Sequence, residues 1–157
     1  MKEKDIVIDH FQLGMSAATA EEMAKLAGGS FPIGGRVPEA AGEAFDWHDW
    51  YTAWVREQGL ESGAQEPTHL MVQAADTFEA TIPWEQLGQA AVLFAQGGAP
   101  LEKSGPIRLY VPNGSSKCLN VKSVVRLRLA RLEGSGHEEA SYGFKRTFSA
   151  EDLRMNK

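Results

Sequence analysis

Short segments of alternating side chains, separated by turn residues, constrain this chain most, because they predict a fold built largely from strands. They fill most of the sequence between residues 68 and 132. We predict strands at 69–73, 78–82, 91–96, 107–111 and 121–132, with a tight hairpin turn at Gly97–Gly98. Within the last segment, Val125, Leu127 and Leu129 are expected to face one way, and Arg126 and Arg128 the other.

The N-terminal part combines a strand with helix signals. Alternation predicts a strand over residues 5–13. Thr19 and Glu22 have the spacing of a capping box, so a short helix is expected to follow and to end at Gly28. Residues 28–44 are rich in glycine, proline and alanine and are expected to form an ordered loop.

The strongest helix signal lies between residues 46 and 59. Asp46 is a good N-cap, and Gly59 is expected to end the helix. Trp47, Trp50 and Trp54 fall on one stripe at helical spacing. Three tryptophans could stack on a cofactor, but this spacing favours packing in the core.

Mixed strands and a few short helices predict an α+β fold. A short helix is also expected from Pro83 to about residue 89, a last strand at 142–148, and a helix cap at 149–152. The chain has 157 residues, which suits a single domain over 1–157.

Composition narrows the class of protein. Cys118 is the only cysteine, so a disulfide within one chain and a zinc site made of several cysteines are excluded. Its expected state is a buried, unreactive thiol. The sequence has no apolar run of membrane-spanning length and no secretory signal pattern at its start, so a soluble cytoplasmic protein is expected.

Positive charge is concentrated late in the chain. The net charge is −5, yet residues 103–132 contain seven lysines and arginines and no acid. An acidic protein of this kind is a poor general nucleic-acid binder. Either the basic segment forms a local anion site, or its cations pair with the acids of the N-terminal part.

Several motifs in this half of the chain match one family in order and spacing. They are A-D-T-F (75–78), T-I-P-W (81–84), A-V-L-F-A (91–95), G-G-A-P-L (97–101), G-P-I-R-L-Y-V-P (105–112) and N-V-K-S-V-V (120–125). Together they resemble the second half of the molybdopterin-binding domain of the sulfite oxidase family. The resemblance covers about residues 17–132 and leaves 133–157 as a C-terminal extension.

The resemblance implies an oxidoreductase-type α+β domain with several small sheets and a molybdopterin, or molybdenum cofactor, as ligand. In that family the last basic segment helps to hold the terminal phosphate of the pterin. Asn120 and Lys122 occupy the positions of that segment's serine and lysine, and Lys117 and Arg126 are expected beside them. Arg36, the one cation of the glycine-rich loop, is a further candidate for contacting the anion.

The chain departs from the family at the cysteine that binds molybdenum. That cysteine is expected within residues 32–42, where none occurs, so the residues do not support oxo transfer at the metal, and no other metal ligand set is evident. Three interpretations stay open. They are a binding or carrier module for a pterin or another phosphorylated anion, a molybdenum oxidoreductase that holds its metal without cysteine, and a non-catalytic protein-interaction domain. We expect a small anionic ligand as partner, neither nucleic acid nor membrane, and leave open a homo-oligomer or a protein partner.

Overall fold

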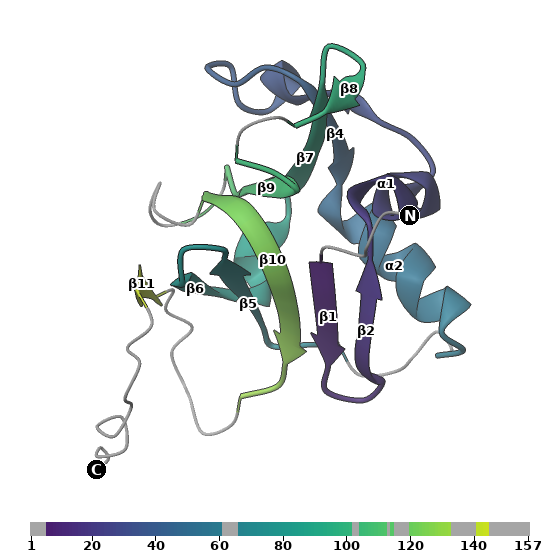
Figure 1. Ribbon diagram of the computed structural model, residues 1–157. Coiled ribbons are helices and arrows are strands. Elements are labelled where there is room, and N and C mark those ends of the chain that lie inside the picture. Colours follow the sequence, from purple (N-terminus) through teal and green to yellow (C-terminus); the bar gives the residue numbers. More distant parts are fainter. Residues whose placement is uncertain are drawn as a thin grey trace.

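The computed structural model describes residues 6–60, 66–101, 104–112, 114, 120–132 and the backbone of 141–144. It is mixed α+β, with many strands and two short α-helices (Figure 1). The elements in chain order are β1 (Ile6–His10), β2 (Gly14–Ala18), α1 (Ala20–Ala27), β3 (Phe31–Pro32), the 3-10 helix η1 (Ile33–Gly35), β4 (Glu43–Asp46), α2 (Trp47–Glu57), β5 (His69–Ala74), β6 (Phe78–Pro83), the 3-10 helix η2 (Trp84–Leu87), β7 (Ala91–Gln96), β8 (Ala99–Pro100), β9 (Ile107–Tyr110), β10 (Val121–Ala130) and β11 (Ser141–Phe144).

The long strand β10 organises the sheet. One of its edges pairs antiparallel with β5, and the other pairs first with β9 and then, in parallel, with β1. Beyond β5 lie β6 and β11, and beyond β9 lie β7, β4 and β3. The β1–β2 hairpin and the β7–β4 strands therefore extend from different halves of β10, as Figure 1 shows.

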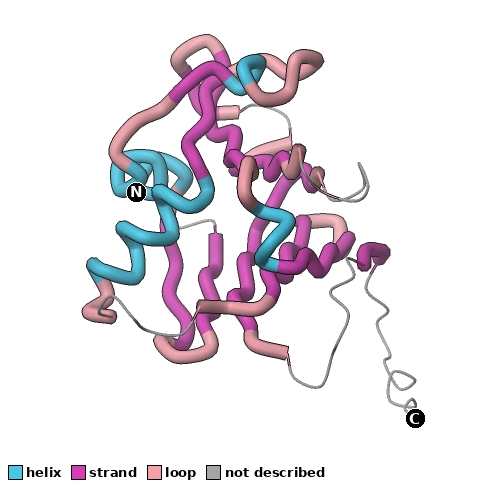
Figure 2. Tube along the Cα trace, turned by 180° about the vertical axis from the view of Figure 1, so that it is seen from behind, coloured by secondary structure: helices cyan, strands magenta, loops and turns pink. Residues whose placement is uncertain are grey.

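The main core lies between this sheet and the two helices, which cover one of its faces (Figure 2). Trp47, Trp50 and Trp54 of α2 are all buried there against strand residues such as Ile8 and Leu127. The tryptophan stripe is thus core packing, as its spacing predicted. A second, smaller core of Ile33, Val37, Ala44, Ala91 and Leu93 lies where the 31–44 segment covers β7.

Several local predictions are confirmed. Thr19 and Glu22 form both hydrogen bonds of the capping box, and Gly28 ends α1 in the left-handed conformation. Asp46 caps α2 through the backbone N–H of Asp49. The turn at Gly97–Gly98 joins β7 to β8.

The predicted strand at 5–13 is wrong in its second half. The chain turns after His10 because the Nδ1 atom of this histidine accepts hydrogen bonds from the backbone N–H groups of Gln12 and Leu13 (3.0 and 3.3 Å). Residues 14–18 then return as β2 beside β1. The segment after Pro83 also differs: it forms only the short 3-10 helix η2, and Pro83 precedes it rather than starting it.

The alternation predicted for β10 is wrong at its start. The register shifts between Val124 and Arg126, and Ser123 has a positive φ of 54°. This bulge buries Val124 and leaves Val125 only half-buried, the reverse of the expectation for Val125. Leu127 and Leu129 face the core as predicted. Residues 145–152, in which the end of the last strand and a helix cap were expected, lie outside the described residues.

Candidate anion site

The face of the sheet opposite the helices brings two arginines and one aspartate together. Ile8 and His10 of β1 are buried in the core, so Asp9 projects from the other face. In the parallel register Asp9 lies beside Arg128, and across the antiparallel pair Arg126 lies beside Gln73 of β5. Strand pairing alone therefore gathers side chains that are more than 100 residues apart.

Asp9 is hydrogen-bonded to Arg126 and lies at ion-pair distance from Arg128. Its Oδ2 atom lies 3.2 Å from the Nη2 atom of Arg126 and 4.0 Å from the Nε atom of Arg128. The side chains of Arg126 and Arg128 are 39% and 57% exposed, against 24% for Asp9. Two cations thus share one less exposed carboxylate, and both arginines retain N–H groups that face solvent.

A small hollow of about 110 Å³ lies beside the arginines. It is lined by Met71, Val72, Gln73, Glu79, Arg126 and Arg128. Small-molecule pockets usually measure about 300–1,000 Å³, so this hollow suits one charged group rather than a whole ligand. The guanidinium forks and the Gln73 amide are donors for an oxyanion, whereas the Glu79 carboxylate on the far side opposes one.

Of the other predicted site residues, none that the structure describes lines this hollow. The Oδ1 atom of Asn120 accepts the backbone N–H of Val111 at 2.7 Å, so the side chain ties β10 to the end of β9. Lys122 is exposed and does not line the hollow. Lys117, like Cys118, lies outside the described residues.

Arg36 is engaged elsewhere. Its Nη1 atom lies 2.8 Å from Oδ1 of Asp46 and 3.2 Å from the carbonyl oxygens of Gln89 and Ala90. Its guanidinium also lies over the Phe31 ring, 4.4 Å from the centroid. These contacts fasten the glycine-rich segment to the start of α2, a structural use of the cation.

Sequence reasoning identified Arg126 but missed three of its neighbours, Asp9, Gln73 and Arg128. Arg128 was detectable, because it alternates with Arg126 on one strand. Asp9 and Gln73 carry no local signal, since only the pairing of distant strands places them there. The Asp9 contacts also show that part of the basic segment pairs with N-terminal acid, one of the two readings of the charge distribution.

A buried polar pair lies on the opposite, helix-covered face. The Nε2 atom of His10 is 2.9 Å from the hydroxyl oxygen of Tyr51, and both side chains are buried. Burial lowers the pKa of His10, against a smaller opposing effect of the Asp9 charge. Burial, helped by the charge of Glu66, raises the pKa of Tyr51. Both groups are therefore neutral near pH 7 and serve the core.

Within the part of the chain that the structure describes, no three histidine, cysteine, aspartate or glutamate side chains are grouped so as to hold a metal ion. None of the described helices is long and apolar enough to cross a membrane. In comparisons with known proteins, no family model matches this chain, and neither a curated protein nor a solved structure shows significant similarity to it.

Proposed function

We propose that this domain binds a small phosphorylated anion, with the phosphate held between Arg126 and Arg128. The observation that carries the proposal is the shared aspartate: Asp9 contacts both guanidinium groups beside a hollow of about 110 Å³. An arginine fork is the group best suited to two parallel hydrogen bonds with a phosphate. The hydrogen bond to Asp9 orients the Arg126 fork before a ligand arrives, which reduces the ordering cost of binding.

The hollow favours a terminal phosphate with the remainder of the ligand outside it. Its volume leaves no room for a ring system, which would lie on the open sheet face near Met71 and Gln73. Both arginines are partly exposed, so salt screens their attraction for an anion, and the affinity should fall as ionic strength rises.

A pterin cofactor is one member of this ligand class. Asn120 and Arg36 are engaged with the protein itself and Lys117 lies outside the described residues, so the proposed phosphate contacts are limited to Arg126 and Arg128. The proposed contacts are with the phosphate group alone. A phosphorylated pterin belongs among the ligands to be tested.

The test is titration calorimetry with inorganic phosphate, pyrophosphate and a phosphorylated pterin. A hydrogen bond to a charged group contributes about 1.5–3 kcal/mol, so Arg126→Gln or Arg128→Gln should weaken binding about ten- to hundredfold. The matched control is Arg56→Gln, which removes an exposed arginine from α2 and should change nothing.

Asp9→Asn separates an anion site from a purely structural ion pair. The amide keeps an oxygen acceptor for the arginines but removes the negative charge that competes with a phosphate, so binding should tighten. No heat of binding with any of the three anions, in the wild type or in Asp9→Asn, would show that the arginines only stabilise the sheet.

A further inference from the structure

One edge of strand β2 has no neighbour among the strands that the structure describes. Among them, β2 pairs with β1 alone. The backbone N–H of Phe11 donates to the carbonyl oxygen of Leu129 in β10. Backbone N–H groups point alternately to the two sides of a strand, so the N–H groups of the even-numbered residues of β1 point toward β2. Ser16 pairs with Ile8 and Ala18 with Ile6, which leaves the N–H and C=O groups of Met15 and Ala17 directed away from β1.

This edge lacks the usual protection against strand addition. Residues 14–18 contain no charge and no proline, and the pairing of β2 with β1 has no register shift. Met15 is 64% exposed, the most exposed large apolar side chain among the described residues. Open edges of this kind accept an extended peptide through main-chain hydrogen bonds.

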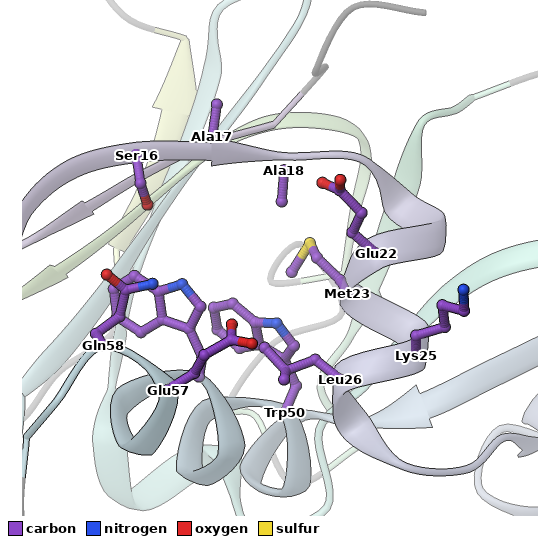
Figure 3. Close-up of a pocket in the computed structure, with 11 residues that line it drawn as sticks. Ser16, Ala17, Ala18, Glu22, Met23, Lys25, Leu26, Trp50, Glu57 and Gln58 are labelled. Atoms are coloured by element: carbon purple, nitrogen blue, oxygen red, sulfur yellow. The ribbon is translucent and has the colours of Figure 1, made fainter.

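A groove of about 460 Å³ lies directly beside this edge, between β2 and the two helices (Figure 3). Met23, Leu26, Trp50 and Trp54 line its apolar side. Met23 and Trp50 are almost fully buried, so Leu26 and the edge of Trp54 provide the accessible apolar surface. Ser16 and Ala18 project into the groove in Figure 3, whereas Ala17 projects away from it. In a strand added to β2, the alternate side chains that face the same way as Ser16 and Ala18 would enter the groove.

The groove wall is polar where the apolar surface ends. Figure 3 shows the carboxylates of Glu22 and Glu57 directed toward the groove, and the amine of Lys25 directed away. Glu57 is the last residue of α2, where the helix dipole favours a cation. The hydroxyl of Ser16 is buried and has no hydrogen-bond partner among the described residues. The groove therefore favours an apolar side chain accompanied by a positive charge.

We infer that the β2 edge and this groove form a docking site for an extended peptide of another protein. The peptide adds a strand to β2 through Met15 and Ala17. It places an apolar side chain over Leu26 and the edge of Trp54 and, two residues away on the same face, a lysine or arginine near Glu57. This site lies on the helix-covered face and does not depend on the proposed anion site.

The test measures binding of a short synthetic peptide to the full chain by fluorescence anisotropy. The peptide is a run of threonines in which one leucine and one lysine stand two positions apart. A matched peptide carries glutamate in place of the lysine. Binding of the lysine peptide, with at least about tenfold weaker binding of the glutamate peptide, is expected from the charge of Glu57. The variant Glu57→Lys should bind the glutamate peptide better than the lysine peptide. A variant that merely failed to fold would bind neither peptide.

Backbone pairing is tested by Ala17→Pro. Proline removes an N–H that faces away from β1, a position where an edge strand tolerates it, so the domain should fold while the lysine peptide loses at least about tenfold in affinity. Ala17→Ser keeps the N–H and should bind normally. No binding of either peptide to the wild type, or equal binding to wild type and Ala17→Pro, overturns the proposal. A concentration-dependent dimer that Ala17→Pro abolishes would overturn it too, by showing that a second copy occupies the edge.

Discussion

The hydrogen bond between His10 and Tyr51 offers a sharp test of how the core is stabilised. The Nδ1 atom of His10 accepts two backbone N–H groups, so the ring proton resides on Nε2 and is donated to the Tyr51 hydroxyl oxygen 2.9 Å away. In Tyr51→Phe this buried N–H loses its partner, at a cost of about 1–3 kcal/mol. For a chain of this length the melting temperature should fall by about 2–12 °C.

The pH dependence of this pair has a definite sign. Burial lowers the pKa of His10 in the folded protein below the 6.5 of the unfolded chain. The unfolded state therefore binds the proton more tightly, and the stabilisation is complete above pH 6.5 and is lost as the pH falls through the folded pKa. Protonation would also turn an N–H of the ring toward the N–H groups of Gln12 and Leu13.

Urea unfolding at several pH values measures this effect. One proton contributes a slope of at most about 1.4 kcal/mol per pH unit, and His10→Asn should lack that contribution. Asparagine can still accept the N–H of Gln12 and so keep the turn. If the wild-type and His10→Asn curves run parallel from about pH 7 to pH 5, His10 is not linked to folding.

Three further changes test individual elements by thermal or urea unfolding. Thr19→Ala removes the capping box of α1 and should cost about 0.5–2 kcal/mol, whereas Thr19→Ser should cost much less. Gly42→Ala should destabilise by at least about 1–3 kcal/mol, because φ is +130° and the added Cβ would lie 2.7 Å from the carbonyl oxygen of Ala95. Arg36→Met keeps the apolar stem but removes the guanidinium that contacts Asp46, two backbone carbonyl oxygens and the Phe31 ring, so it should cost at least about 1 kcal/mol; unchanged stability would contradict the structural role of this cation.

The helices were largely predictable from the sequence because their signals are local. Thr19 and Glu22 determine the start of α1, and Asp46 determines the start of α2, within three residues of chain. The tryptophan stripe likewise needs only the helical period to identify the face that is buried. The α+β class followed from these elements and from the alternating segments after residue 68.

The turn at His10 and the bulge at Ser123 were not predictable in the same way. Residues 5–13 keep the alternation of a strand, and the turn depends on a histidine side chain that accepts backbone N–H groups. Ser123 takes a positive φ although nothing in V-K-S-V-V distinguishes it from a regular strand. Its N–H bonds to the carbonyl oxygen of Ser104, and its carbonyl accepts the N–H of Ala75, so distant segments hold it there.

Two irregularities in β10 leave its charge pattern on the face that the sequence predicts. The register with β9 shifts between Val121 and Val124, and the register with β5 shifts between Val124 and Arg126. Because the two shifts offset one another, Val121, Leu127 and Leu129 are all buried, and Lys122 keeps the same alternation as Arg126 and Arg128. Among the described cations, Arg126 and Arg128 lie beside Asp9, because the parallel register pairs β1 with residues 126–129. Lys122 precedes that stretch and does not line the hollow. The candidate anion site therefore depends on which part of β10 pairs with β1, and the alternation of the sequence does not contain that information.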